Sequence, residues 1–478
     1  MNNFEVVIGI ENHVELKTTS KMFASSQVNF NSPQNTNIDP MALALPGSLP
    51  TVNKKGVELA ILACNGLNME IDSLLRFDRK SYYYSDLPKG FQITQNFFPI
   101  GKEGTLEISV NGKQKIVEIE RLHIEEDTAK QTHKGEFTYI DYNRSGNGLV
   151  EIVTKPVLRS ADEAIAYLEA LRETLLYLGI SDVKMNEGSL RCDINISLRP
   201  FGFKELGTKV EIKNLNSFNN VKKAIEFEIK RQSEMLLKNE IILSETKRFD
   251  EQSQQTKTMR VKDTAVDYKY FAEPNITPIR LDEKWINKII SKSPELAKDR
   301  RKRYVGEYKL SEKDANHLLT NYDLAIFFEQ TVNLKVDPKK AYNLITSDIQ
   351  SSLNTNNVEI NNSNFSPKKI AEIIERLDKG EISSKHVKTI ISILGEKDQP
   401  IGKIIEQNGL KLITDPKLIS DIIIKLAENN QKMIEENIKT RPERVEKTLM
   451  GQLMKETAGN VSLVVANEIL LKLLNSFK

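Results

Sequence analysis

The chain has 478 residues, of which 28% are charged and 39% hydrophobic, with 22 glycines and 16 prolines. This composition excludes a collagen-like, low-complexity or wholly disordered protein, and the length predicts about three domains. The 68 Lys and Arg residues nearly balance the 66 Asp and Glu residues, so the net charge of +2 does not indicate a nucleic-acid binder, although charge can still gather locally.

The N-terminal residues and the cysteine count bear on location. Glu5 and Glu11 flank a five-residue apolar stretch, without the basic region of a secretory signal. No apolar run approaches the ~18 residues of a membrane span. Cys64 and Cys192 cannot form a disulfide framework and suit a reducing compartment. We therefore predict a cytoplasmic protein with no membrane contact.

Alternating apolar and polar residues predict strands in the first half of the chain. In SLRCDINISLR, from Ser189, Cys192 and Ile194 share one face, while Asp193 and Asn195 share the other. Similar patterns predict strands at residues 4–16, 115–124, 148–153 and 209–213. We expect an antiparallel or mixed sheet whose inner face packs on helices.

Two helices are predicted in this half of the chain, one after the strand at 148–153 and one after the strand at 209–213. Ser160 and Glu163 form a capping-box pattern in front of an apolar stripe that Gly179 ends. A second helix is predicted from Ser217 to about residue 237.

Strand patterns disappear near Ser293, and helical patterns continue to the C-terminus. Helices are predicted after Ser366, at residues 387–394, 416–426 and 445–453, and after Gly459. The predicted fold class is α+β, with a sheet-rich cradle domain at 1–292, an all-α domain at 293–405 and a small helical domain at 406–478.

Several common catalytic motifs are absent. The chain has no Walker loop, dinucleotide-binding glycine motif, HEXXH, CXXC or GXSXG. None of its Ser-Ser pairs lies in a glycine-rich loop near a lysine. A side-chain nucleophile is therefore disfavoured, and any nucleotide is held without a Walker loop.

Acidic residues and one histidine suggest a cation site. Glu11 and His13 leave the same face of a predicted strand, Glu125 and Glu126 follow in RLHIEED, and Glu151 lies in the apolar segment GLVEIV. Such donors suit Mg²⁺ or Mn²⁺ better than structural zinc. From spacing alone, solvated strand residues are the commoner explanation, but Glu151 fits it least because its neighbours indicate burial.

A second candidate site is FDRKSYYYSDLPKGFQITQ, from Phe77. It combines Arg79, Lys80 and Lys89 with amide side chains and three tyrosines. This mixture fits phosphate or nucleic-acid contacts, and a polar loop with structural tyrosines explains it equally well.

Taken together, these segments resemble the GatB family, the B subunits of tRNA-dependent amidotransferases. The resemblance rests on these segments: VVIGIENHVELKT, LPGSLPTVNK, FDRKSYYYSDLPKGFQITQ, RLHIEEDTAK, SDVKMNEGSLRCDINISLR, EIKNLNSF and KRFDE. It extends over essentially the whole chain. No large insertion separates the two halves, which makes the related GatE subunits a poorer match.

The resemblance implies that glutamate on tRNA(Gln), or aspartate on tRNA(Asn), is converted into the amide. ATP would phosphorylate the carboxylate, and ammonia would then displace phosphate. The ammonia would come from a GatA-like amidase subunit through a channel, and a GatC-like small subunit would complete the enzyme. Such chemistry needs a cation and positive donors, which agrees with the absent nucleophile motifs.

The resemblance also implies roles for individual residues. The implied ligands of Mg²⁺ or Mn²⁺ are Glu11, His13, Glu126 and Glu151, with Glu125 and Asp127 as nearby candidates. Implied catalytic residues are Glu126, Glu151, Lys80 and Lys89, the two lysines at the entry to the ammonia channel. Arg79 and Asp193 are expected to bind cofactor, and Asn195 is a weaker candidate on the same face as Asp193.

Some positions depart from the family pattern. Asn12 replaces an apolar residue between Glu11 and His13, which makes the local backbone geometry a point for the structure to decide. KMFASSQVNF lacks the cysteines of zinc-binding relatives, so no zinc is expected.

The last domain resembles a YqeY-type tail that contacts the tRNA elbow, with Lys447 and Lys455 as candidate contacts. The alternative to a catalytic subunit is a tRNA-binding adaptor whose acidic residues are structural.

Overall fold

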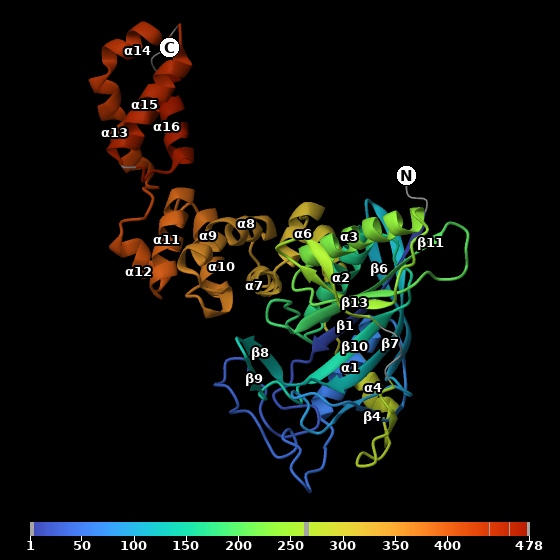
Figure 1. The fold of residues 1–478 in the computed structure, drawn as a ribbon. Coiled ribbons are helices and arrows are strands. Elements are labelled where there is room, and N and C mark those ends of the chain that lie inside the picture. The colour runs from blue at the N-terminus through green and yellow to red at the C-terminus, as the bar shows by residue number, and fades with distance from the viewer. Residues whose placement is uncertain (1–3, 262–266, 439, 458, 476–478) are drawn as a thin grey trace. The chain divides into compact units, whose positions relative to one another are not determined.

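The computed structural model describes residues 4–261, 267–438, 440–457 and 459–475, and the chain divides into two units, Met1–Ala297 and Lys298–Lys478 (Figure 1). Every named strand of the described residues lies in the first unit, and helices build the second. The predicted α+β class is confirmed. The predicted domain boundaries, after residues 292 and 405, stay predictions.

A large mixed sheet organises the first unit. Its nine strands within the described residues run in the order β14-β13-β12-β11-β1-β10-β7-β6-β2. Their bounds are β1 Phe4–Glu15, β2 Glu70–Ile71, β6 Gly101–Val110, β7 Lys113–Glu126, β10 Gly148–Thr154, β11 Leu190–Pro200, β12 Val210–Lys213, β13 Glu245–Asp250 and β14 Gln255–Val261. All neighbouring strands are antiparallel except β12 and β13, which are parallel. The five strands predicted from alternation are confirmed as β1, β7, β10, β11 and β12.

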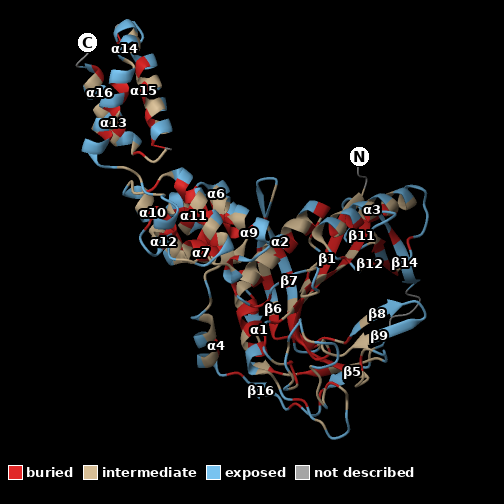
Figure 2. Cartoon of the chain, turned by 90° about the vertical axis from the view of Figure 1, so that its left-hand side faces the viewer, coloured by how far each residue is buried: buried red, intermediate tan, exposed pale blue. Residues whose placement is uncertain are grey.

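One face of the sheet is covered by helices. These are α1 Lys54–Gly66, α2 Ala161–Tyr177 and α3 Phe218–Leu237, as Figure 2 shows. Ile8 and Ile10 of β1 pack in one apolar core with Leu168 and Leu171 of α2, all four fully buried. Because neighbouring strand residues point to opposite faces, the residues between these apolar ones are left for the other face of the sheet.

Helix α2 begins at the predicted serine, but the capping box is only half formed. Ser160 Oγ accepts the N–H of Glu163 at 3.1 Å. The Glu163 carboxylate does not return to the serine N–H. It accepts instead from Arg159 N–H at 2.7 Å and from Lys115 Nζ at 2.6 Å. The prediction was wrong on this second bond, because the lysine offers the carboxylate an opposite charge.

Asn12 leaves strand β1 regular. It pairs in register with Ile152 and Cys192, and the strand continues through it. Its side chain is fully buried, and neither the amide nitrogen nor the amide oxygen has a hydrogen-bond partner among the described residues. The substitution therefore affects the energy of the core and not the backbone geometry of Glu11 and His13.

Smaller sheets stand beside the large one. Their strands are β4 Asp78–Ser81, β5 Phe91–Thr94 and β15 Phe271–Ala272 in a three-stranded sheet, β3 Leu74–Leu75 with β16 Ile279–Arg280, and β8 Lys130–Lys134 with β9 Phe137–Asp141. Helix α4, Glu283–Ile290, follows β16. Gln92 Nε2 donates to the carbonyl of Glu126 at 2.7 Å, and Gln95 Oε1 accepts the N–H of Ile124 at 3.0 Å. These two amides fasten β5 and the segment after it to the end of β7.

The helices of the second unit include those predicted from sequence. In chain order they are α5 Ala297–Gly306, α6 Glu312–Leu319, α7 Tyr322–Val332, α8 Pro338–Leu344, a π-helical turn Ile345–Ile349, α9 Gln350–Asn356, a 3-10 helix Ile360–Asn362, α10 Pro367–Asp378, α11 Ser384–Glu396, α12 Ile401–Gln407, α13 Pro416–Asn429, α14 Gln431–Asn437, α15 Pro442–Glu456 and α16 Leu463–Asn475. Helices α13 to α16 have a core of their own. In the part of the chain that the structure describes, no helix has the length and apolar character to cross a bilayer.

Candidate active site

Polar side chains meet on the sheet face opposite the helices. The strand register places His123 opposite Glu151, Glu151 opposite His13, and His13 opposite Arg191, in one line across β7, β10, β1 and β11. Facing partners in adjacent strands lie about 5 Å apart, so this line brings the four side chains into mutual reach.

Four residues on this face form what we call the histidine–carboxylate cluster: His13, His123, Glu125 and Glu151. His13 Nε2 lies 3.5 Å from Glu125 Oε1 and 3.4 Å from Glu151 Oε2. His123 Nε2 lies 3.1 Å from Glu151 Oε2 and 3.7 Å from Glu125 Oε2. The ligand atoms of His13, Glu125 and Glu151 all lie within 4.8 Å of one another, so one imidazole and two carboxylates can bind a single divalent cation.

Charges inside the cluster reinforce each other. Burial alone would raise the pKa of Glu151, but His123 and His13 hold it well below its ordinary value. Burial would lower the pKa of His123, but Glu151 and Glu125 raise it to about 9. The cluster is thus arranged to keep Glu151 ionised, as a metal ligand must be.

His123 is a cluster residue that the sequence analysis did not identify. Its side chain is buried, and its Nδ1 has no hydrogen-bond partner among the described residues. A signal was present, because His123 and Glu125 stand two apart in RLHIEE and therefore share a strand face, like Glu11 and His13.

Glu126 is placed differently from the other implied ligands. It follows Glu125 directly on β7, so strand alternation turns its side chain away from the face that carries Glu125. Its carboxylate forms a buried ion pair with Lys89 and accepts the N–H of Ile93 at 3.0 Å. Glu126 belongs to neither of the two groups of side chains that could bind a metal ion among the described residues.

Glu11 lies in the second of these groups, with Asp193 and Glu211. The ammonium of Lys213 already occupies this group, with Nζ 2.5 Å from Asp193 Oδ2 and 3.1 Å from Glu211 Oε1. Asn195 Nδ2 donates to Glu11 Oε1 at 2.8 Å. Glu11 is therefore not part of the histidine–carboxylate cluster that contains His13. Asn195 and Lys213 already supply partners to the carboxylates of the Glu11 group. Sequence reasoning missed Glu211 and Lys213, which lie on the separate strand β12.

Lys80 and Arg79 leave β4 toward different partners. Lys80 Nζ lies 4.9 Å from the ring centroid of Tyr268. Burial lowers the pKa of Lys80, but the nearby carboxylates of Glu125 and Glu151 raise it overall, which places the ammonium beside the histidine–carboxylate cluster. Arg79 forms two hydrogen bonds to Glu273, at 2.6 and 3.0 Å, and is therefore already paired.

Asp127 is also already paired. Its Oδ2 lies 2.5 Å from Arg144 Nε and 3.0 Å from Arg191 Nη2. With both cations on one oxygen, Asp127 anchors the loop before β10 and the polar face of β11.

A buried lysine beside the Lys89–Glu126 pair escaped the sequence analysis. Lys21 is 0% exposed, and its Nζ donates a long hydrogen bond of 3.4 Å to the carbonyl of Tyr142. A methyl group added at Gly146 would lie 3.2 Å from Lys21 Cδ, so the glycine leaves room for the lysine stem. Burial lowers the pKa of Lys21 to about 8; Asp39, Glu126 and Asp141 raise it, and Lys89 lowers it.

We expect Lys21→Met to stabilise the protein by roughly 2–3 kcal/mol at pH 7. Near pH 7 the folded protein must bury a charged ammonium, whereas between pH 8 and 10.5 the folded lysine is neutral while the unfolded one is still protonated. The sign follows from linkage: because the unfolded chain binds the extra proton in that window, the wild type should gain stability as pH rises through it, and its difference from the variant should shrink. Urea unfolding at pH 7 and pH 9.5 measures this, with the exposed Lys113→Met as control; a constant difference would contradict it.

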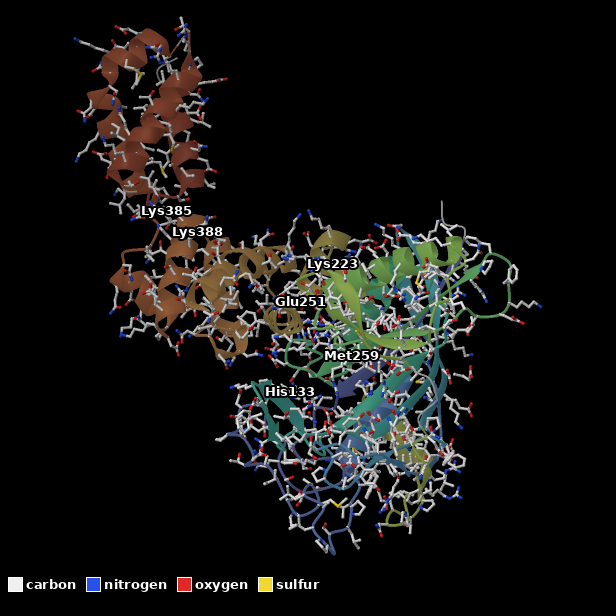
Figure 3. The ribbon with its side chains drawn as sticks, in the orientation of Figure 1. His133, Lys223, Glu251, Met259, Lys385 and Lys388 are labelled. Carbon is white, nitrogen blue, oxygen red and sulfur yellow. The ribbon has the colours of Figure 1, made fainter. Side chains whose placement is uncertain are left out.

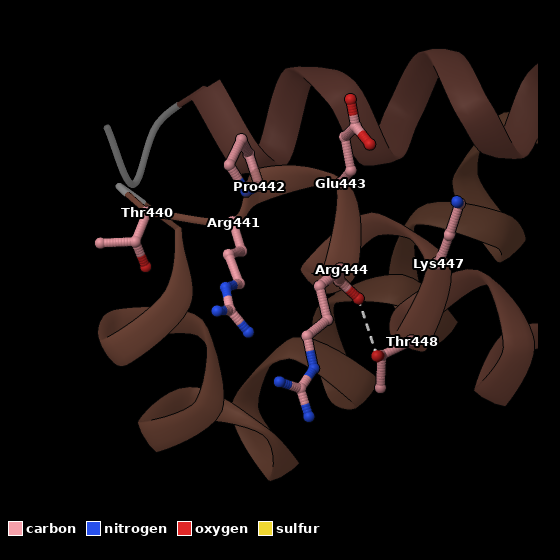
Figure 4. Close-up of a pocket in the computed structure, with 7 residues that line it drawn as sticks. All are labelled: Thr440, Arg441, Pro442, Glu443, Arg444, Lys447 and Thr448. Atoms are coloured by element: carbon pink, nitrogen blue, oxygen red, sulfur yellow. Dashed lines mark hydrogen bonds between the residues drawn. The ribbon is translucent and has the colours of Figure 1, made fainter.

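The helical tail α13–α16 contains a basic pocket (Figure 4). A cavity of about 610 Å³ is lined by three cations and one carboxylate, with uncharged side chains between them: Thr440, Arg441, Pro442, Glu443, Arg444, Lys447 and Thr448. Figure 4 shows Arg441 and Arg444 extending in the same direction. Lys447, a candidate from sequence, lines this pocket; Lys455 is not among the lining residues. The three cations outnumber the single carboxylate, so the pocket can donate several hydrogen bonds to the phosphates of a nucleic-acid backbone.

Two family models match the chain. The GatB/GatE catalytic domain matches residues 6–287, which contain the histidine–carboxylate cluster and the Lys89–Glu126 pair. The GatB domain that is also associated with YqeY matches residues 326–474, which contain the basic pocket.

Full-length relatives carry one common description. A protein of Mycoplasma mycoides subsp. mycoides SC is 56% identical over 474 residues, covering 99% of both chains. One of Mesoplasma florum is 55% identical over 477 residues, covering 100% of this chain and 99% of the relative, and one of Oceanobacillus iheyensis is 44% identical over 475 residues, covering 99% and 100%. All three are described as the B subunit of aspartyl/glutamyl-tRNA(Asn/Gln) amidotransferase.

Proposed function

The chain belongs to the GatB family of aspartyl/glutamyl-tRNA(Asn/Gln) amidotransferase B subunits, and we propose that its sheet face carries the amide-forming centre of that enzyme. It acts as one subunit of a multi-subunit, tRNA-dependent ligase. The substrate we propose is glutamate on tRNA(Gln), aspartate on tRNA(Asn), or both. This agrees with the resemblance found from sequence.

The histidine–carboxylate cluster is the observation that carries the proposal. We assign Mg²⁺ or Mn²⁺ to His13, Glu125 and Glu151, because these three hold ligand atoms within 4.8 Å of one another. This differs from the ligand set inferred from sequence, in which Glu126 stood in place of Glu125 and Glu11 was included. A bound cation would neutralise the phosphate charge of ATP during phosphoryl transfer.

The protein side chains have distinct tasks in this proposal. His123 holds Glu151 in position through its Nε2, at 3.1 Å. Lys80, beside the cluster, offers a positive charge to the phosphate that leaves when ammonia attacks the activated carboxylate. No side chain needs to act as a nucleophile, which agrees with the absent motifs.

The Lys89–Glu126 pair suits the route of ammonia. Both side chains are buried, and Lys21 lies close enough for Glu126 to offset part of the burial effect that lowers the pKa of Lys21. We propose that this polar group lines the path of ammonia from a GatA-like amidase subunit, with a GatC-like subunit completing the complex.

Arg79 and Asp193, expected from sequence to bind cofactor, are held by Glu273 and Lys213, so their roles stay predictions. We propose a cytoplasmic location because charged tRNA is used there. We also propose that the protein binds no zinc.

One assay separates this proposal from a tRNA-binding adaptor. The chain is copurified with its proposed A and C partners and incubated with both mischarged tRNAs, ATP, Mg²⁺ and either glutamine or ammonium chloride. Amide formation is expected to need ATP with either nitrogen source. We also expect Glu126→Gln to leave glutamine hydrolysis intact while removing glutamine-driven amide formation. Full amide formation by Glu126→Gln, or by Glu151→Gln in the cluster, would favour the adaptor.

For the tail, we expect Arg441→Gln with Arg444→Gln to weaken tRNA binding roughly tenfold at ~0.1 M salt. The slope of log affinity against log salt should also fall by about 2, because two phosphate contacts are removed.

The matched control for this pair is Lys425→Gln with Lys432→Gln, which removes the same charge from exposed positions on α13 and α14. Equal losses for both pairs would mean that only net charge matters. Removal of the tail after Asn408 is expected to weaken tRNA binding while complex assembly persists.

A further inference from the structure

Five aromatic rings form a continuous line that we call the aromatic row. Its members, in spatial order, are Tyr84, Tyr82, Tyr268, Tyr270 and Phe97. Successive ring centroids lie 5.8, 5.9, 6.1 and 6.3 Å apart, each pair in an edge-to-face arrangement. Three separate segments of the chain supply these rings, so only the tertiary structure assembles the row.

The aromatic row lies outside the apolar core. Tyr84 is 61% exposed and Phe97 51% exposed at the two ends, and the three middle tyrosines are only half-buried. Core packing therefore does not account for the row. Exposed rings that contact one another lose little entropy when a flat partner stacks on them, because the protein has already ordered them.

Positive charge accompanies the aromatic row. Lys80 Nζ lies 4.9 Å from the centroid of Tyr268 and 5.8 Å from that of Tyr82. Rings interleaved with cations are the arrangement by which proteins bind single-stranded nucleic acid, the rings holding bases and the cations holding phosphates.

One part of the row also borders the histidine–carboxylate cluster. Lys80, whose ammonium lies against Tyr268 and Tyr82, stands directly opposite Gln92 in the β4–β5 pair, so the middle of the row reaches the strand that is fastened to the end of β7. Burial raises the pKa of Tyr270, and the carboxylates of Glu151 and Glu125 add to this effect. Tyr82 donates its hydroxyl to Gln92 Oε1 at 3.3 Å, and Gln92 is in turn bonded to the carbonyl of Glu126. These two hydrogen bonds join Tyr82 to the end of β7, the strand from which Glu125 points into the cluster.

We propose that the aromatic row binds the unpaired 3′ end of the charged tRNA, stacking its bases and leading the aminoacyl group to the histidine–carboxylate cluster. This inference rests on the proposed function, since the amino acid to be amidated is attached to the terminal nucleotide. A single strand fits better than a duplex, because paired bases have no free faces to stack on the rings. Recognition through stacking would be indifferent to whether the amino acid is Glu or Asp.

Binding measurements with full-length protein test the aromatic row directly. The probe is uncharged tRNA(Gln) whose terminal adenosine is replaced by 2-aminopurine, a base whose fluorescence falls on stacking. We expect quenching by the wild type and by Tyr84→Phe. For Tyr84→Ala with Phe97→Ala we expect a loss of quenching and about tenfold weaker binding, equivalent to ~1.4 kcal/mol. Both positions are exposed, so these variants should fold.

Two controls make the result specific. Phe137→Ala removes an exposed ring from the β8–β9 hairpin, where Figure 3 labels His133, and should change neither quenching nor affinity. A tRNA lacking its last three nucleotides should bind the wild type and the Tyr84→Ala/Phe97→Ala variant equally. Unchanged quenching, or an equal loss with the shortened tRNA, would overturn the proposal.

A protein partner on the aromatic row is the competing outcome. If Tyr84→Ala with Phe97→Ala impairs copurification with the partner subunits but leaves tRNA binding unchanged, the row is a contact between subunits and the proposal fails. Failure of the proposed function would look different, because the wild-type complex would then form no amide even when tRNA binding and quenching are normal.

Discussion

Replacing Glu151 by glutamine is expected to lower the rate of ATP-dependent amide formation by about 10²–10³-fold. Glu151 is the residue that both histidines of the cluster contact, at 3.4 Å from His13 and 3.1 Å from His123. Glutamine keeps the size of the side chain but removes the charge that would bind a cation. Single-turnover assays with charged tRNA and ammonium chloride measure the chemical step without the glutaminase.

The variant should also lose affinity for Mn²⁺, which calorimetry measures without any turnover. Glu107→Gln, at an exposed position on strand β6 of the same sheet, is the matched control and should keep the wild-type rate. Glutamine hydrolysis by the partner subunit should continue in both variants. A Glu151→Gln enzyme with normal Mn²⁺ binding and normal amide formation would rule out the assigned cation site.

Breaking the Lys89–Glu126 pair is expected to have the largest effect on stability. The two side chains are 6% and 5% exposed, so removing one leaves the other charge buried without a partner. We expect Lys89→Met to lower the free energy of unfolding by about 3–5 kcal/mol. The double variant Lys89→Met with Glu126→Leu should recover much of that loss, because two apolar side chains of similar volume replace the pair.

The control for burial is Lys17→Met, which breaks the exposed pair between Lys17 and Asp182. Exposed pairs contribute ~0–1 kcal/mol, so this variant should unfold at nearly the wild-type urea concentration. If the double variant were as unstable as Lys89→Met, the loss would come from packing and not from an unpaired charge. Stable but inactive double variants would assign the pair to function.

The outcome for Glu125 and Glu126 shows the limit of reasoning from motifs. The sequence RLHIEED makes both glutamates candidates, and the resemblance favoured Glu126. The structure turns Glu125 toward His13 and Glu151, and joins Glu126 to Lys89. Neighbouring residues of a strand point to opposite faces of the sheet. Two adjacent glutamates therefore do not show which of them points toward the histidines.

The separation of Glu11 from the cluster has a similar origin. Glu11 and His13 share a face of β1, as their spacing indicated, but each meets different residues across the sheet. Asp193 of β11 lies directly opposite Glu11, and Lys213 of β12 reaches Asp193, so the group around Glu11 is neutralised by a lysine. Neither partner strand is adjacent to β1 in sequence, and their register is fixed only in the folded sheet.

The sequence by itself determined the α+β class, five strands of the large sheet, the starts of helices α2, α3, α10 and α13, and the family, because periodicity, caps and motifs are local properties. The tertiary structure alone decided which acids meet which histidines, that Lys21 is buried, and that rings from three segments line up beside Lys80. These depend on strand register and on contacts between distant segments, which no local pattern encodes. The near-balance of 68 basic and 66 acidic residues likewise hides local differences in charge that only the tertiary structure shows. Acids gather at the histidine–carboxylate cluster, and cations gather at Lys80, at Lys89 and in the basic pocket.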